Sequence, residues 1–300
     1  MLAQAGFFLT EPDLRTVAFD LVARRDRELR IVKVLTNIDA LSATVARDLR
    51  ILSTYLNGRP MVVGERSAAG PLEEGVVYLR HGIPIVEYST LSDLYLKGVP
   101  PFIFAAPGGP YVQMNGERLR HLRYERGLSL GQLADAAGVS RKAIQLYEQG
   151  KNAMVDVAEK LEEYLGQPMI APLDPFSLAQ AEKGRTREDG HHFRGFQRQV
   201  VDQLEDLGFT MAYPKKANIE AISNSNGSIL ISGIGATAPE MQERGRLLHQ
   251  LQRVTEKDTV LFLQRPGEKQ NISGTPVLSR EDLDRLADPK AILELVKERK

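Results

Sequence analysis

The chain contains no cysteine and no tryptophan among its 300 residues. The absence of cysteine excludes disulfides, cysteine-ligated metals and thiol catalysis. No apolar run approaches the roughly 18 residues of a membrane span, and no signal peptide is recognisable at the start. Lys and Arg number 39, as do Asp and Glu, so no charge of one sign dominates. We therefore expect a cytoplasmic protein of two or three domains with no membrane partner.

The most informative stretch is residues 116–151, GERLRHLRYERGLSLGQLADAAGVSRKAIQLYEQGK. Gly127 is suited to end a first helix, because a helix terminus often needs a positive φ. Ser129 is then a favourable N-cap for a second helix. Gly138 marks a tight turn, and Ser140 caps a third helix. The order predicts a helix-turn-helix in the middle of the chain.

Apolar residues continue at helical spacing through this stretch and beyond it, which predicts one compact core. A fourth helix follows the third. The inward-facing set consists of Leu119, Leu122, Leu130, Leu133, Ala134, Ala137, Val139, Ile144, Tyr147, Met154, Ala158, Leu161 and Leu165. We expect a central all-α domain over residues 112–176.

The polar face of the third helix predicts the function of this domain. A recognition helix places its N-terminal residues against base edges in the major groove. Arg141 can donate to both acceptors of guanine, and Lys142 to a base or a phosphate. Gln145 and Leu146 follow one turn later, and Lys151 follows a glycine whose turn can meet a phosphate. The predicted contacts to double-stranded DNA are Ser129, Gln132, Ser140, Arg141, Lys142, Gln145, Leu146 and Lys151.

Charge and pattern agree with this interpretation. Residues 115–151 hold seven Lys or Arg side chains against four acids, a local positive excess suited to DNA. The stretch resembles the Cro/C1 or XRE class of helix-turn-helix. The resemblance is carried by Leu119-Arg120, Leu122-Arg123, Gly127-Leu128-Ser129, Leu133-Ala134, Gly138-Val139-Ser140, Ile144 and Tyr147-Glu148-x-Gly150. Many members carry a phosphate-binding Gln at the start of the second helix, where this chain has Leu130-Gly131.

The arms that flank this domain both predict α/β folds, because helices alternate with apolar strands. In the first arm, apolar residues between Leu14 and Val22 suggest a helix. Residues 29–35 suggest a strand, and Ser42 is placed to cap a long helix. Further strands are expected at 60–63, 76–78 and 83–86.

The second arm repeats the ending of the first. Pro84 and Pro276 each stand in a short apolar strand, and leucines follow each proline at seven and ten residues. This agreement favours an internal duplication, with two unrelated α/β domains as the alternative. The expected domains are residues 1–111, 112–176 and 195–300, with a polar linker at 177–194.

The arms also resemble the restriction-endonuclease-like fold of Holliday-junction resolvases. Active members need two carboxylates for a metal ion and a Lys that orients the attacking water. Lys33 lies on a strand, but Ile31 stands where the resemblance implies an acid. Asp26 and Asp39 are near in sequence but misplaced, and strand 229–232 has neither acid nor Lys. We therefore expect arms without catalysis, cofactor or metal; the adjacent His191-His192 has no recognisable third ligand.

Over nearly its whole length the chain resembles a family of archaeal transcriptional regulators that carry a Cro/C1-type helix-turn-helix between two α/β arms. The resemblance implies a sequence-specific DNA-binding regulator, not an enzyme. Helix-turn-helix proteins usually act as homodimers, and whether the arms bind a small-molecule effector stays open. Two alternatives remain: a protein-interaction cofactor that bridges to the transcription machinery, and a metal-dependent nuclease with an unrecognised site.

Overall fold

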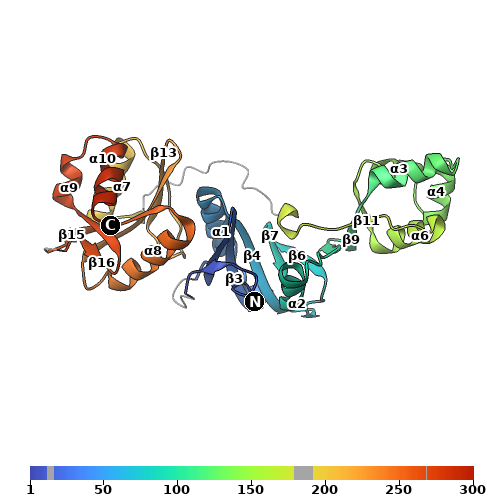
Figure 1. Cartoon of the computed structure of the whole chain (residues 1–300), viewed down its shortest axis with the longest axis horizontal. Coiled ribbons are helices and arrows are strands. Elements are labelled where there is room, and N and C mark those ends of the chain that lie inside the picture. The colour runs from blue at the N-terminus through green and yellow to red at the C-terminus, as the bar shows by residue number, and fades with distance from the viewer. Residues whose placement is uncertain (12–16, 179–191, 268) are drawn as a thin grey trace. The chain divides into compact units, whose positions relative to one another are not determined.

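The computed structural model describes residues 1–11, 17–178, 192–267 and 269–300 (Figure 1). The chain divides into two compact units. One comprises Met1–Met1, Leu35–Ala40 and Met61–Gln180, and the other comprises Leu2–Val34, Leu41–Pro60 and Ala181–Lys300. Among the helices of the described residues, none combines the length and the apolar character needed to cross a membrane.

The first arm begins with three antiparallel strands, β1 (Phe8–Leu9), β2 (Leu21–Arg25) and β3 (Glu28–Asn37). Leu21 pairs with Val32 in the β2–β3 hairpin, and Asp26 occupies its turn with φ 50°. The expected helix between Leu14 and Val22 is therefore wrong at its C-terminal end, and Leu14 lies outside the described residues. A short apolar run cannot be assigned to helix or strand from periodicity alone.

A short 3₁₀ helix (Ile38–Ala40) leads to helix α1 (Ala43–Leu56). The side chain of Ser42 accepts a hydrogen bond from the backbone N–H of Val45 at 3.2 Å, as expected of an N-cap. Asn57 ends the helix in the left-handed conformation. The buried face of α1 is formed by Val45, Ala46, Asp48, Leu49, Ile51, Leu52 and Leu56.

The remaining elements of the first arm lie in the unit that contains Met61–Gln180, apart from the start of β4. Strand β4 runs parallel to β7, β7 is antiparallel to β6, and β6 runs parallel to β8. The elements are β4 (Arg59–Ser67), β5 (Gly70–Pro71), β6 (Val76–Arg80), β7 (Ile83–Val86), helix α2 (Tyr88–Ser92), the π-helix η2 (Asp93–Lys97), β8 (Ile103–Ala106) and β9 (Gly109–Met114).

The central domain contains the four expected helices, α3 (Gly116–Glu125), α4 (Leu130–Ala137), α5 (Arg141–Tyr147) and α6 (Val155–Leu165). It is not all-α. Strands β10 (Asn152–Met154) and β11 (Ile170–Ala171) both pair with β9, and Val112 and Met114 of β9 enter the core of the helices. Met154 is thus the N-cap of α6 rather than part of it. A 3₁₀ helix, η3 (Pro175–Leu178), follows.

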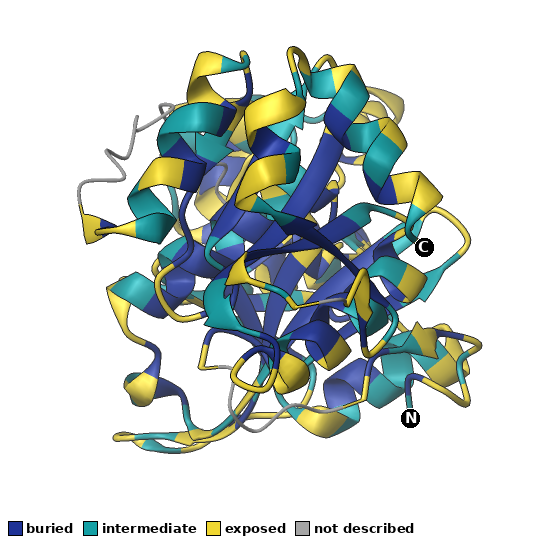
Figure 2. Ribbon diagram, turned by 90° about the vertical axis from the view of Figure 1, so that its left-hand side faces the viewer, coloured by how far each residue is buried: buried dark blue, intermediate teal, exposed yellow. Residues whose placement is uncertain are grey.

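The second arm is a six-stranded sheet in the order β12-β13-β14-β15-β17-β16. Figure 2 shows buried strands alongside helices with exposed outer faces. The elements are α7 (Phe196–Asp206), β12 (Thr210–Ala212), β13 (Ala221–Ser225), β14 (Ser228–Thr237), α8 (Gln242–Thr255), β15 (Asp258–Arg265), β16 (Asn271–Ile272), β17 (Thr275–Ser279), α9 (Arg280–Arg285) and α10 (Pro289–Glu298).

The two arms share an order of elements. An antiparallel hairpin (β2–β3, β13–β14) precedes a long helix (α1, α8). A strand then pairs in parallel with one further along the chain (β4 with β7, β15 with β17). In each arm the last of these strands leads into a short helix, α2 or α9.

Candidate nucleic-acid interface

Both N-caps predicted in the central domain form. Ser129 Oγ accepts from the N–H of Gln132 at 3.2 Å, and Gln132 Oε1 accepts from the N–H of Ser129 at 2.8 Å. This reciprocal pair is a capping box at the start of α4. Ser140 Oγ accepts from the N–H of Ala143 at 3.1 Å and caps α5. These side chains therefore fix where the two helices begin.

Helix α5 is held from one side and exposed on the other. Ile144 is 0% exposed within the helical core. The turn before the helix uses Gly138 at φ 70°, a conformation that favours glycine. All eight predicted DNA contacts are exposed: Ser129, Gln132, Ser140, Arg141, Lys142, Gln145, Leu146 and Lys151. Leu146, with 40% of its surface exposed, is a large apolar side chain in this set.

The side chain of Arg141 lies against Gly131 of helix α4. A Cβ atom built on Gly131 would lie 3.2 Å from Arg141 Nε and 3.3 Å from its Nη2. Gly131 stands at the position where the sequence departs from the family pattern. The missing side chain there leaves room for the Arg141 guanidinium close to the first turn of α4.

A buried ion pair joins the end of α5 to α3, and sequence reasoning did not find it. Arg123 Nη2 donates to Glu148 Oε2 at 3.1 Å, and Arg123 Nε donates to Glu148 Oε1. The Glu148 residue is 8% exposed. Its hydrogen bond to Arg123 raises the pKa of that guanidinium above its ordinary value. The Tyr147-Glu148-x-Gly150 pattern was the available signal, but it does not reveal the partner.

The first arm contains the acid that pairs with Lys33, which sequence reasoning also missed. Asp20 Oδ1 lies 3.0 Å from Lys33 Nζ, and Asp20 Oδ2 accepts from the N–H of Val34 at 2.6 Å. Asp20 immediately precedes β2. The sequence analysis expected a helix over this segment. Side chains of a helix and of a strand point in different directions, so the helix assignment did not bring Asp20 next to Lys33.

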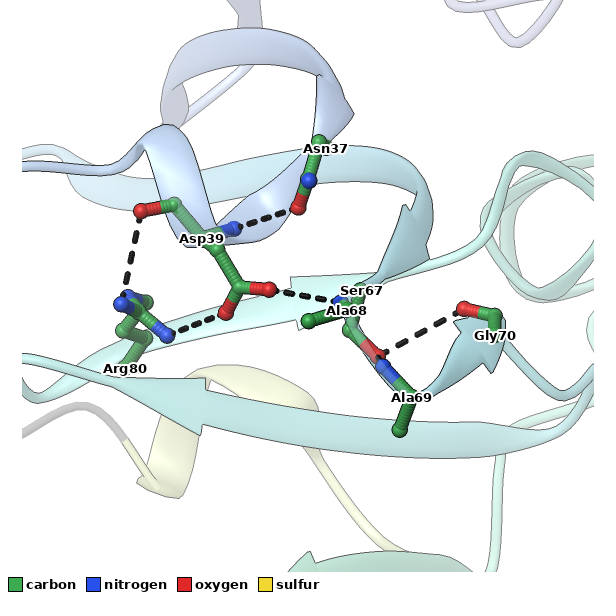
Figure 3. Close-up of polar contacts among 7 residues, drawn as sticks. All are labelled: Asn37, Asp39, Ser67, Ala68, Ala69, Gly70 and Arg80. Atoms are coloured by element: carbon green, nitrogen blue, oxygen red, sulfur yellow. Dashed lines mark hydrogen bonds and ion pairs between the residues drawn. The ribbon is translucent and has the colours of Figure 1, made fainter.

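The expected acid position beside Lys33 is occupied by Ile31, which is 0% exposed. Asp26 lies in the β2–β3 turn, away from Lys33 in the strand register. Asp39 belongs to another network, shown in Figure 3. Its Oδ2 accepts from the N–H of Ala68 at 2.6 Å, and its Oδ1 lies 2.6 Å from Arg80 Nη1. Asp39 therefore secures the β4–β5 turn.

The second arm has an acid at the same place in its hairpin. The N–H of Asp20 donates to Val32 O at 2.8 Å, and the N–H of Glu220 donates to Ser232 O at 3.1 Å. Glu220 Oε2 also accepts from the N–H of Ile234 at 3.0 Å, as Asp20 accepts from Val34. The counterpart of Lys33 by this register is Gly233, which has no cation to offer.

Arg244 of helix α8 supplies the missing charge. Its Nη1 forms an ion pair with Glu220 Oε1, and its Nη2 donates to Asn218 Oδ1 at 3.0 Å. A Cβ on Gly233 would lie 3.1 Å from Arg244 Cδ. The glycine therefore leaves the space through which Arg244 passes. Burial raises the pKa of Glu220, although Arg244 opposes the shift.

Asp20, Ile31 and Lys33 of the first arm do not fit the metal centre of an active nuclease. Both oxygens of Asp20 are engaged by protein donors, and the second acid position holds Ile31. A catalytic ion in such a site needs the carboxylate pair. Within the described residues, no group of three or more His, Asp or Glu side chains could hold a metal. His191 lies outside those residues, and His192 stacks near Phe193 with ring centroids 4.0 Å apart.

Comparison with known families assigns a class to two parts of the chain. Residues 1–101 match the model of a PD-(D/E)XK superfamily domain. Residues 116–169 match the model of a helix-turn-helix domain. The class is therefore a nuclease-like domain followed by a helix-turn-helix domain.

Full-length relatives identify the family. Proteins described as "Putative HTH-type transcriptional regulatory protein" from Halorubrum lacusprofundi and Methanocella arvoryzae are each 35% identical. The matches cover 100% and 99% of this chain and 94% and 93% of those proteins. A Haloquadratum walsbyi relative is 36% identical, with 100% of this chain and 94% of that protein covered. The chain belongs to this family of archaeal HTH-type transcriptional regulatory proteins.

A solved structure also matches, a chain of the "SINR PROTEIN/SINI PROTEIN COMPLEX". It is 22% identical and covers 32% of this chain and 84% of that chain, with a TM-score of 0.17. That score is too low to support a structural comparison.

Proposed function

We propose that this protein is a sequence-specific DNA-binding regulator that acts as a homodimer and reads the major groove with helix α5. One observation carries the proposal: Arg141, Lys142 and Gln145 are exposed on a helix whose Ile144 is fully buried. The buried residue fixes the helix, and the exposed ones are types that donate to base edges and phosphates.

We assign different roles to the exposed residues. Arg141, beside Gly131 at the first turn of α4, is placed for a phosphate, because a helix N-terminus also attracts anions. Lys142 and Gln145 are assigned to base edges, and Leu146 to a thymine methyl. Ser129, Gln132 and Ser140 hold the helix starts and border the same surface, while Lys151 is assigned to a phosphate.

We propose the homodimer because helix-turn-helix proteins usually act in pairs. Two recognition helices that face successive major grooves lie about 34 Å apart on one side of the duplex. A two-fold symmetric protein then reads a site that is itself nearly palindromic. We assign the arms to dimerisation and not to catalysis, since the Asp20–Lys33 pair lacks a second carboxylate.

We also infer that the arms arose by duplication. The support is the shared order of elements and the matched backbone contacts of Asp20 and Glu220. The arms would then be the domains at 1–111 and 195–300, with the DNA-reading domain at 112–176 and a linker at 177–194. The linker falls mostly outside the described residues.

The test is selection of DNA sequences by the purified full chain, followed by gel shifts across salt concentrations. The proposal expects an enriched, nearly palindromic site whose binding resists competitor DNA and weakens steeply with salt. Light scattering of the protein alone should give twice the chain mass. Absence of any enriched sequence, with the protein correctly folded, would favour the protein-interaction cofactor instead.

A further inference from the structure

We propose that Gly131 determines which residues of α5 contact bases, because its missing side chain lets Arg141 lie against α4 as a phosphate ligand. Base reading then falls to Lys142 and Gln145. The inference rests on the proposed DNA binding through α5, and it adds a residue of a second helix that sets the sequence preference. Gly131 has no side chain to offer DNA, so it is a positioning residue that acts through Arg141.

The guanidinium of Arg141 occupies the space that a side chain at position 131 would need. A Cβ atom on Gly131 would lie 3.2 Å from Nε, 3.3 Å from Nη2 and 3.5 Å from Cζ of Arg141. Cβ atoms in proteins rarely approach a neighbour as closely as the first two of these distances. Any other residue at position 131 would therefore displace the guanidinium from its place against α4.

The Arg141 guanidinium is available to a ligand. The first turn of α4 holds no acidic residue. Within the described part of the chain, Arg141 forms no hydrogen bond or ion pair. Leu130 and Gly131 have no side-chain donor, so Arg141 brings a positive charge to a turn that begins without one. A phosphate oxygen accepts such charged donors at normal hydrogen-bond distances.

Positions around α5 also separate Arg141 from the residues assigned to bases. At 3.6 residues per turn, Arg141 lies about 60° around the helix from Ile144, whereas Lys142 lies about 160° from it. Because Ile144 is fully buried, Arg141 stands on the flank of α5 near the core and Lys142 on the outer face. Gln145 lies about 100° from Ile144, between the two. Lys142 and Gln145 can therefore reach base edges while Arg141 lies against α4.

The position of Arg141 decides whether it carries sequence information. A contact to a phosphate fixes the protein on the duplex but does not distinguish one base pair from another. A guanidinium released into the major groove can instead donate to both acceptors of guanine. Since Gly131 keeps Arg141 against α4, a longer side chain at position 131 should convert a phosphate ligand into a reader of bases.

Sequence selection and gel shifts across salt concentrations test the inference on the full chain, with the wild type, Gly131→Ala and Gly131→Gln. Both new residues suit a helix better than glycine does, so thermal unfolding should show no loss of stability. Gly131→Gln should gain a preference for guanine at one base pair of about fivefold or more. It should also lower the slope of log affinity against log salt by about 0.9, because one phosphate contact is lost. Gly131→Ala should change both quantities in the same direction by less.

Two controls isolate the role of Arg141. In an Arg141→Ala background, Gly131→Gln should alter neither base preference nor salt slope, because the side chain through which Gly131 acts is gone. Ala136→Gln places the same new side chain about 140° around α4 from Gly131. It should leave the preference of the wild type unchanged.

The inference is overturned if the wild type selects a site and Gly131→Gln keeps the same base preference and salt slope. It is also overturned if Gly131→Gln changes the preference equally in the Arg141→Ala background, because the new side chain then reads the base itself. If Gly131→Gln unfolds, Gly131→Ala decides by the same criteria. A wild type that selects no sequence would refute the proposed function, and this inference with it.

Discussion

Glu148 accepts hydrogen bonds from two nitrogens of Arg123, so the residue that ends α5 is tied to helix α3. Arg120 Nε also lies 3.7 Å from Glu148 Oε2. The carboxylate is nearly buried, and its charge is therefore balanced by these guanidinium groups. The ion pair holds the C-terminal end of α5 against α3.

Replacement of Glu148 by Ala should destabilise the central domain by about 3–5 kcal/mol, because it leaves the Arg123 charge buried without its partner. Urea denaturation followed by circular dichroism measures the change. The exposed acid Glu117, at the start of α3, provides the control: Glu117→Ala should change stability by less than about 1 kcal/mol. Equal losses in the two variants would show that the Arg123–Glu148 ion pair adds no measurable stability.

Substitutions on helix α5 should affect overall DNA affinity and sequence preference separately. Gln145→Ala should cost about 1–3 kcal/mol at its cognate base pair and relax preference there. Arg141→Ala should weaken binding to all sequences and reduce the slope of log affinity against log salt by about 0.9. Gel shifts on the selected site and on single-base variants measure both. Lys160 is an exposed cation on α6, and Lys160→Ala should leave both quantities unchanged. If Arg141→Ala loses base preference while Gln145→Ala does not, Arg141 rather than Gln145 contacts a base edge.

Glu220 should make the protein less stable as pH rises. Its pKa is raised by burial, so the folded state holds a proton that the unfolded state releases. The resulting stability is present below the unfolded value of 4.5 and is lost as the pH rises through the folded pKa. Glu220→Gln should remove this decline, which cannot exceed about 1.4 kcal/mol per pH unit for one proton. Thermal unfolding from pH 4 to 8 measures it, and identical profiles for both proteins would contradict the prediction.

The Asp282–Arg299 pair should act in the opposite direction. Burial alone would raise the pKa of Asp282, but hydrogen bonds from Arg299 and Ser279 outweigh it and hold the pKa below 3.8. This pair therefore stabilises the fold above pH 3.8 and loses its effect as the pH falls through the folded pKa. Asp282→Asn should cost stability at pH 7 and very little at pH 2. A loss of the same size at both pH values would point to the capping box with Ser279 instead.

No magnesium-dependent cleavage of plasmid or branched DNA is expected, since the first arm offers a metal ion one carboxylate whose oxygens are already engaged. The assay compares the wild type with Asp20→Asn and Lys33→Ala. Cleavage that disappears in both variants would establish a nuclease and overturn this expectation. Cleavage that persists in both would indicate a contaminating enzyme.

The helix-turn-helix could be predicted almost residue by residue, because its signals are local. Ser129, Gly138 and Ser140 act within one turn of where they stand, and the apolar spacing identifies the buried face. The strands that complete this domain escaped prediction. Val112 and Met114 enter its core from β9, a strand that precedes the motif in sequence.

The N-terminal hairpin shows the opposite case. The apolar residues before Asp20 and after it suit a helix as well as a strand, and the choice is made by pairing with β3. Since a strand acquires its hydrogen bonds from a partner strand, its assignment depends on residues outside the local window. The misassigned helix concealed Asp20, and with it the partner of Lys33.

The sequence by itself determined the class of this protein, the caps and core of its helix-turn-helix, and the missing acid at Ile31. Only the tertiary structure decided which charges neutralise each other: Arg123 with Glu148, Lys33 with Asp20, and Arg244 with Glu220. The physical reason is the range of the interactions. Capping and helical periodicity act over three or four residues, whereas each of these ion pairs joins different elements and forms only after the chain has folded.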